Sequence, residues 1–294
     1  LGATGRLGRL VADALSRNCP QDFRVWFQHR VAGEAFGAQW FYWDFAQNGA
    51  GLTDLCGVVG DIGMLINFAG VTDSGNSQDL DRNASLAAAS CDHARAFGIP
   101  RVLVASSVAV YGRPGPNERL SEGASLAPIS GYGRAKCDME RRLLARPGRV
   151  QVTCLRIGNA AGADALLLNA TGACSERPLN LDQFADGRTP RRSYIGPETL
   201  ARVLISLARA EVSGRALPRV MNVASPVPVF MGDLVQALKA QAGDLAVRMV
   251  PARKGSIASV DLDVSLLEKF HEFAELDSDA NEMIRQVLAC RGLA

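Results

Sequence analysis

Short apolar runs alternate with longer segments of helical periodicity along the first half of the chain. Five apolar runs predict strands, at residues 23–28, 40–43, 64–68, 102–106 and 150–155. Three amphipathic segments predict helices, at residues 7–16, 77–97 and 132–144. Strands that alternate with helices in this way indicate a parallel sheet covered by helices. We therefore predict an α/β fold built on a doubly wound parallel sheet.

The pattern changes after residue 156. Residues 159–192 are rich in Gly, Ala, Asn and Pro and have weak periodicity, which indicates loops that select a ligand. Residues 197–209 and 231–241 predict helices, residues 219–224 predict a strand, and the tail from residue 247 predicts a small α+β lid.

These patterns divide the chain into two interleaved parts. We expect a Rossmann-type domain that binds NADP at residues 1–156, with residues 197–224 returning to it. A smaller α+β substrate-binding lobe is expected from residues 157–196 and 225–294. Ligands of open α/β sheets bind in the crevice at the carboxyl ends of the strands, so the cleft between these parts is the predicted site.

The first residues form a glycine-rich turn, Gly2-Ala3-Thr4-Gly5-Arg6-Leu7-Gly8, directly before a predicted helix. Glycines let the backbone approach a pyrophosphate, and the helix N-terminus then faces the anion. Glycine turns also serve plain packing, so the motif gains weight from its place at the start of a wound α/β pattern. The strand that feeds this turn is expected before Leu1.

Composition excludes several other classes of protein. The 294 residues are 48% hydrophobic and 21% charged, with a formal net charge of +2. Lys and Arg are scattered without a long basic run, and no apolar stretch approaches the length of a membrane span. We expect a soluble cytoplasmic protein that binds a small molecule, and neither nucleic acid nor a membrane.

Seven cysteines lie singly along the chain, without a Cys-x-x-Cys pair. Cys91 and His93 are neighbours, but they are too close together for the usual zinc pattern. An odd count within apolar surroundings favours reduced, buried thiols. We therefore predict no metal site.

The end of the second predicted strand bears on the choice of cofactor. An NAD enzyme places a carboxylate there against the adenine ribose, whereas this chain has Gln28-His29-Arg30. Arg30 and Arg6 are suited to a 2′-phosphate, although both can equally be solvated surface residues. Asp44 can bind the adenine edge or be an ordinary carboxylate at a strand end. NADP is the predicted cofactor, with NAD as the alternative.

The strongest chemical signal is a serine segment followed by a Tyr-x-x-x-Lys pair. Lys136 follows Tyr132 by four residues, so both side chains project from one helix face. An ammonium there is expected to lower the pKa of the phenol from about 10, which would make a general acid or base. Ser107, at a strand end, can position a substrate carbonyl or hydroxyl. We predict these three residues as the catalytic set.

Taken together, these motifs resemble the extended branch of the short-chain dehydrogenase/reductase superfamily, also described as the NAD-dependent epimerase/dehydratase family. The resemblance extends over nearly the whole chain. It implies a Ser-Tyr-Lys triad of Ser107, Tyr132 and Lys136, and substrate contacts by Asn159 and Arg192. It implies cofactor binding by Gly2, Gly5, Gly8, Asp44, Phe68, Ala69, Gly70 and Lys136. To this predicted cofactor site the turn and the strand end add Thr4, Arg6, Leu7 and Arg30. The resemblance also implies a homodimer.

The chain departs from that family pattern in two places. Members that act on nucleotide sugars often carry Arg-Asp-Phe-Ile-His-Val, where this chain has Arg192-Ser193-Tyr194-Ile195-Gly196-Pro197. The arginine that grips a diphosphate is present and the histidine is not; a salt bridge from Arg192 to Glu198 is the alternative role. Sugar 4,6-dehydratases place Thr-Asp-Glu at the serine segment, and Ser107-Val108-Ala109 lacks both carboxylates, so dehydration is not expected.

Three functions stay open at this point. The first is an NADP(H)-dependent oxidoreductase that acts on a carbonyl or hydroxyl of a small or sugar-derived substrate. The second is a nucleotide-sugar epimerase that keeps its cofactor bound while it oxidises and re-reduces one carbon. The third is a regulator that senses NADP without catalysis. The Tyr-Lys pair favours an enzyme, because a sensor has no need of it.

Overall fold

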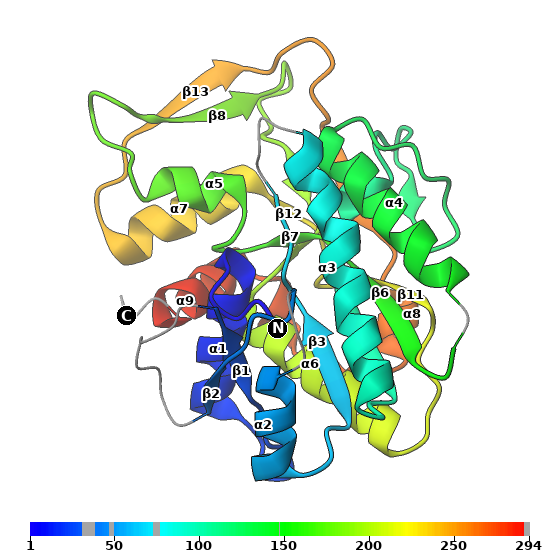
Figure 1. The fold of residues 1–294 in the computed structure, drawn as a ribbon. Coiled ribbons are helices and arrows are strands. Elements are labelled where there is room, and N and C mark those ends of the chain that lie inside the picture. Colours follow the sequence, from blue (N-terminus) through cyan, green and yellow to red (C-terminus); the bar gives the residue numbers. More distant parts are fainter. Residues whose placement is uncertain (31–38, 47–49, 73–76, 147, 291–294) are drawn as a thin grey trace.

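The computed structural model describes residues 1–30, 39–46, 50–72, 77–146 and 148–290 (Figure 1). Four parallel strands form the central sheet in the order β11-β6-β4-β3. Their bounds are Met64–Asn67 (β3), Arg101–Ser107 (β4), Gln151–Ile157 (β6) and Val220–Val223 (β11). A separate parallel pair consists of β1 (Phe27–His29) and β2 (Trp40–Tyr42). The predicted Rossmann-type α/β fold is confirmed.

Helices cover both faces of the central sheet because successive strand residues point to opposite sides. Val102 and Val104 of β4 face the core beneath α3 (Ser77–Ala96) and α4 (Gly131–Ala145), which pack side by side (Figure 1). Leu103 faces the core that includes α1 (Arg6–Asn18) and α6 (Pro197–Val212). This is the doubly wound arrangement.

A second apolar core lies outside the sheet, around residues such as Leu167, Tyr194, Leu234 and Met283. It is built from α5 (Ala165–Ala170), β8 (Leu179–Gln183), β10 (Tyr194–Ile195), α7 (Met231–Ala242), β13 (Val247–Pro251) and α9 (Ala280–Cys290). The strand β10 pairs with β7 (Asn159–Ala160). Figure 1 shows β8, β13, α5 and α7 together at the top of the molecule. That this lobe binds the substrate stays a prediction.

The tail differs in part from the expected lid. The strand β14 (Ser259–Leu262) pairs with β5 (Arg119–Leu120) and β9 (Arg191–Arg192), and β9 also pairs with β12 (Val229–Phe230). Val260 and Leu262 of β14 are buried in the same core as α1 and α6, as is Leu267 of α8 (Ser265–Glu268). This part of the tail therefore packs with the sheet. The remaining elements are α2 (Ala50–Val59), η1 (Val108–Val110) and η2 (Glu275–Ser278).

The strand predicted at residues 23–28 is wrong over most of its length. Of these residues only Phe27 and Gln28 belong to a strand, β1 (Phe27–His29), which pairs with β2. Phe23 and Val25 are half-buried and pack against the first core instead. The alternating apolar side chains of residues 23–26 are therefore explained by packing against the core and not by a strand.

The backbone of Leu1 runs beside β3. Its amino group donates to the carbonyl of Ile66, and its carbonyl accepts from the N–H of Phe68 at 3.0 Å. A cavity of about 380 Å³, lined mainly by apolar side chains that include Phe27 and Leu65, lies between β1 and β3. The strand expected before Leu1 stays a prediction.

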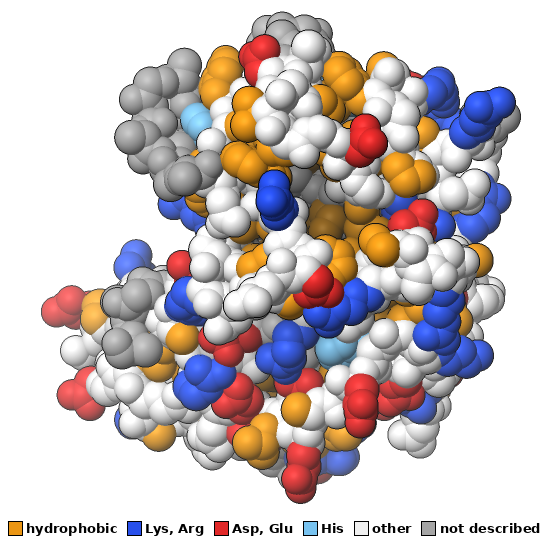
Figure 2. Space-filling model, turned by 90° about the horizontal axis from the view of Figure 1, so that it is seen from below, with side chains coloured by type: hydrophobic (Ala, Val, Ile, Leu, Met, Phe, Trp, Pro, Cys, Tyr) orange, Lys and Arg blue, Asp and Glu red, His pale blue; other side chains and the backbone are white. Residues whose placement is uncertain are grey.

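Charged side chains of both signs are interspersed on the face that Figure 2 shows. Among the described helices, none is long and apolar enough to cross a membrane. Within the same residues, no group of three or more His, Cys, Asp or Glu side chains is placed to hold a metal ion.

Candidate active site

A cavity of about 650 Å³ lies where the predicted site residues converge. The glycine turn forms one wall, and Ser107, Tyr132 and Lys136 form another. Residues 157–160 and 163–165 complete the lining. The structure thus brings the predicted catalytic set and the predicted phosphate-binding turn to one cleft at the carboxyl ends of β4 and β6.

The first turn of α4 carries Tyr132 into this cleft. The hydroxyl of Ser130 caps the helix by accepting from the N–H of Gly133 at 3.0 Å. A Cβ at Gly133 would lie 2.4 Å from the carbonyl oxygen of Ala109, so only glycine lets α4 approach η1 this closely. That approach brings Tyr132 beside the end of β4.

Tyr132 and Ser107 share a side-chain hydrogen bond. Burial raises the pKa of Tyr132 above its ordinary value, and the bond with Ser107 lowers it. The expectation that Lys136 lowers this pKa is wrong for the free protein, because the ammonium lies 5.8 Å from the ring centroid and is itself desolvated. The phenol therefore keeps its proton at neutral pH.

Lys136 is almost completely buried, with 4% of its surface exposed. Its Nζ donates to the carbonyl of Ala105 at 2.9 Å. Burial lowers its pKa to about 8, and the carboxylate of Glu140 acts in the opposite direction. The side chain is thus an ammonium at neutral pH, held between β4 and the phenol of Tyr132.

Two glycines of the turn, Gly2 and Gly8, pack too tightly to be replaced by a residue with a side chain. A Cβ at Gly8 would lie 2.1 Å from the carbonyl oxygen of Gly2, and one at Gly2 would lie 2.6 Å from the N of Ala69. Gly5 is the N-cap of α1, and no side chain of the described residues caps it. The turn thus leaves the backbone N–H groups at the start of α1 facing the cavity, as an anion requires.

Two buried asparagines, neither of them among the predicted site residues, hold the loop after β3. Asn67 accepts from the N–H of Ala69 at 2.8 Å. Asn83 accepts from the N–H of Val71 at 3.2 Å and donates to its carbonyl at 3.0 Å. Gly70 passes beside Asn83 and the Nζ of Lys136, where a Cβ would be too close. Polar residues at buried positions of an otherwise apolar pattern were the signal that could have found them.

A second missed group lies beside the predicted substrate residue Asn159. Tyr194 shares a side-chain hydrogen bond with Asn159, and its hydroxyl donates to Asp164 at 3.0 Å. Burial raises the pKa of Asp164 and, with the nearby carboxylate, raises that of Tyr194. Asn159 and Asp164 both line the cavity, so the far wall carries two polar side chains among apolar ones.

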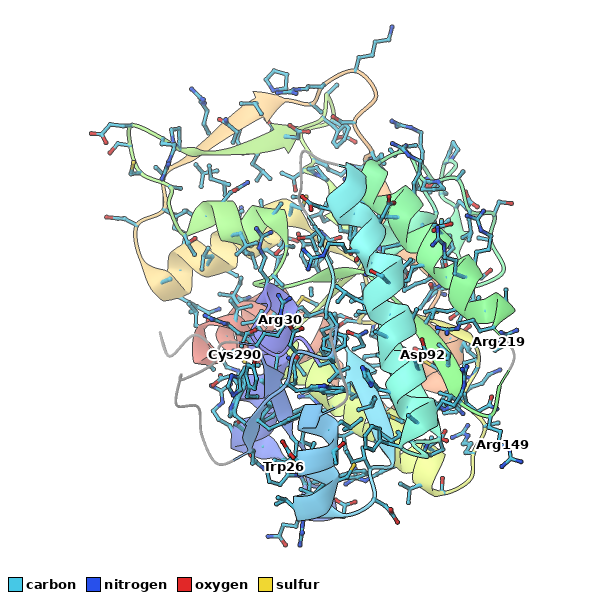
Figure 3. All side chains as sticks on the ribbon, viewed as in Figure 1. Trp26, Arg30, Asp92, Arg149, Arg219 and Cys290 are labelled. Carbon is cyan, nitrogen blue, oxygen red and sulfur yellow. The ribbon has the colours of Figure 1, made fainter. Side chains whose placement is uncertain are left out.

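Several predicted residues lie outside the lining of this cavity. Arg30 is exposed after β1, as Figure 3 shows, and Asp44 follows β2. The guanidinium of Arg192 donates to the carbonyls of Arg191, Ile257 and Ala258 at 2.8, 2.8 and 3.3 Å. Burial lowers its pKa. The roles of these three residues stay predictions.

The other predicted residues divide by position. Phe68 and Gly70 line the cavity, as do four residues of the turn, Gly5, Arg6, Leu7 and Gly8. Gly2, Thr4 and Ala69 are not among its lining residues; Gly2 packs against the backbone of Ala69, and the carbonyl of Thr4 accepts from Arg9 at 2.9 Å. The alternative salt bridge between Arg192 and Glu198 is wrong, since Glu198 pairs with two other arginines, Arg17 and Arg285.

A family model agrees with this geometry. Residues 1–224 match the model described as the NAD dependent epimerase/dehydratase family. No curated protein matches the chain.

Solved structures extend the likeness over the whole fold. A UDP-glucose 4-epimerase from Brucella ovis in complex with NAD is 22% identical, with a TM-score of 0.79, and the match covers 99% of this chain and 96% of that one. A UDP-glucose 4-epimerase from Stenotrophomonas maltophila, solved with NAD and a formylated UDP-arabinopyranose, is 20% identical (TM-score 0.77; 100% and 98% covered). The UDP-Glc/GlcNAc 4-epimerase of Campylobacter jejuni is 18% identical (TM-score 0.73; 100% and 98% covered). At these identities the likeness establishes the fold.

Proposed function

The chain belongs to the NAD-dependent epimerase/dehydratase family of enzymes, and on that premise we propose that it transfers a hydride between a nicotinamide dinucleotide and an oxygen-bearing carbon of a sugar-derived substrate. The observation that carries the proposal is the convergence of Ser107, Tyr132 and Lys136 on one cavity whose opposite wall is the glycine turn. Packing alone gives no reason for these residue types to meet there.

The residues present fit a dinucleotide. The uncapped start of α1 and the close turn at Gly5 and Gly8 suit the pyrophosphate. Lys136, an ammonium at the floor of the cleft, suits a ribose hydroxyl, and the loop held by Asn83 borders the same space. When bound there, the nicotinamide supplies the hydride donor and acceptor.

In this proposal Tyr132 moves the proton. Its raised pKa keeps the phenol protonated at neutral pH, which suits donation to the oxygen of a carbonyl that is being reduced. Ser107 orients that oxygen through a hydrogen bond. In the reverse direction Tyr132 takes the proton of a hydroxyl as its carbon loses the hydride.

The same residues support net reduction and epimerisation, and the protonated resting state of Tyr132 favours reduction as the first reaction to test. Nucleotide sugars are the first substrate class, because the similar solved structures are those of enzymes that act on them. Asn159 and Asp164 supply the polar side chains that sugar hydroxyls need.

NADP(H) is the proposed cofactor. Gln28, buried at the end of β1, accepts from the N–H of Gly2 at 2.8 Å and also bonds to the carbonyl of Trp43, so it ties the turn to β2. Arg30 is exposed just beyond it, and Arg6 lines the cavity. Residues 28–30 offer the cation of Arg30 and no carboxylate, which suits the 2′-phosphate of NADP. Two of the similar solved structures contain NAD instead.

The experiment is a substrate panel with the purified protein. NADPH or NADH is mixed with UDP-hexoses and their keto derivatives, oxidation is followed at 340 nm, and the sugar products are read by proton NMR. We expect turnover in the wild type and in Tyr42→Phe, which alters an exposed tyrosine outside the cavity, and none in Tyr132→Phe. Turnover that survives in Tyr132→Phe would refute the proposed role.

A further inference from the structure

Three consecutive residues of β4 are each bonded to a different turn of α4. The carbonyl of Ala105 accepts from Lys136, the hydroxyl of Ser106 donates to the carboxylate of Glu140, and Ser107 is bonded to Tyr132. Tyr132, Lys136 and Glu140 are spaced by four residues, so they lie on one face of the helix. The first two are in the proposed catalytic set, and the proposed function gives the third no role.

Glu140 is held by a buried ion pair. Its carboxylate is 2% exposed, and Arg156, 4% exposed, donates to it through Nε at 3.1 and 3.2 Å and through Nη2 at 2.7 Å. Arg156 of β6 is the register partner of Ser106 in β4, so both side chains lie on the sheet face that α4 covers. Arg156 also donates to the hydroxyl of Tyr111 at 3.1 Å and to the carbonyl of Glu122 at 3.0 Å.

We propose that Glu140, neutralised by Arg156, is a positioning residue: through Ser106 it fixes the end of β4 against α4 and so sets the distance between Ser107 and Tyr132. Successive strand residues point to opposite faces, so fixing Ser106 on the α4 side also fixes the direction in which Ser107 enters the cleft. The inference rests on the proposed function only where it concerns turnover.

The charged and titratable groups around this carboxylate come from each element packed on it. Arg156 and Cys154 approach from β6, and Lys136 and Cys137 approach from α4 itself. Arg156 supplies the opposing charge at contact distance and holds the carboxylate of Glu140 where it accepts from the hydroxyl of Ser106.

The test is Ser106→Ala, which cuts the link to β4 and leaves the ion pair intact. We expect kcat to fall about tenfold or more with KM changed less than about twofold, because Ser107 and Tyr132 are misplaced while the surface that binds the substrate remains. Ser106→Thr, which keeps the hydroxyl, should restore kcat. Ser206→Ala is the control, since Ser206 of α6 is bonded to His271 and lies outside the cavity lining.

A second readout needs no substrate. The chain has four tyrosines, so subtracting the ultraviolet titration of Tyr132→Phe isolates Tyr132. In Ser106→Ala its midpoint should rise by about 0.4–1 unit as the bond from Ser107 to the phenolate weakens. Glu140→Gln should also raise the midpoint of Tyr132. Glu211→Gln, which breaks the comparable ion pair of Glu211 with Arg101, should leave it unchanged.

The outcomes separate the two claims. A raised midpoint supports the positioning role even when no sugar in the panel turns over. An unchanged midpoint in a folded Ser106→Ala protein overturns it, as does a loss of kcat that Ser206→Ala reproduces. If Glu140→Gln fails to fold, Ser106→Ala decides alone.

Discussion

Gly8→Ala is the most direct perturbation of the glycine turn. The added Cβ would lie 2.1 Å from the carbonyl oxygen of Gly2 and 2.8 Å from the Cα of Ala3, and both neighbours are backbone atoms that cannot rotate away. The turn must open by roughly 1 Å to restore an ordinary contact. Overpacking of this kind costs about 1–3 kcal/mol, or roughly 2–5 °C in Tm for a chain of this length.

The same displacement moves the start of α1 away from the position that the pyrophosphate requires. We therefore expect the Kd for NADPH, measured by fluorescence titration, to rise at least about tenfold, the loss of about one charge-assisted hydrogen bond. Gly57→Ala is the matched control, because its Cβ in α2 meets nothing within 4 Å, and it should raise stability by about 0.5–1 kcal/mol. A Gly8→Ala protein that binds NADPH like the wild type would refute the reasoning.

Three further substitutions test the site. Tyr132→Phe should abolish turnover and leave the Kd for NADPH nearly unchanged, because only the hydroxyl that moves the proton is lost; calorimetric titration that shows weaker binding would contradict this. Arg30→Ala should weaken NADPH by about ten- to a hundredfold and leave NADH nearly unchanged, and equal losses for both cofactors would refute a phosphate contact. Lys136→Met should raise stability below pH 8 by at most about 3 kcal/mol, because the pKa of Lys136 falls from 10.5 unfolded to about 8 folded. This gain should fade between pH 8 and 10.5 in urea titrations, and a gain that is independent of pH would show that burying the charge is not its cause.

The sequence predicted those elements whose pattern comes from one dominant cause. The helix α3 and the strands β4 and β6 are apolar on the faces they bury, and their observed bounds lie within two residues of the expected ones. Gly2, Gly5 and Gly8 could be placed because a tight turn before a helix leaves few other residue types. The prediction for residues 23–26 was wrong because an apolar run does not show whether its side chains are buried within a strand or outside one.

The polar network of the site could be predicted only in part. Tyr132 and Lys136 are linked by local helical spacing, so their common face was visible in the sequence. The contact of Lys136 with the carbonyl of Ala105 was not visible, because that carbonyl meets Lys136 only after β4 and α4 pack together. The pKa of Tyr132 was predicted in the wrong direction because burial, which raises it, depends on tertiary structure.

The central claim is that the cleft at Tyr132 transfers a hydride, and a single-turnover measurement tests it most directly. Wild-type protein saturated with NADPH is mixed with the 4-keto derivative of a UDP-hexose, and the absorbance at 340 nm is recorded over one turnover. We predict a fall equivalent to one cofactor per site in the wild type and no fall in Tyr132→Phe that still binds NADPH. A wild-type protein that binds NADPH and the sugar but shows no change at 340 nm would contradict the account.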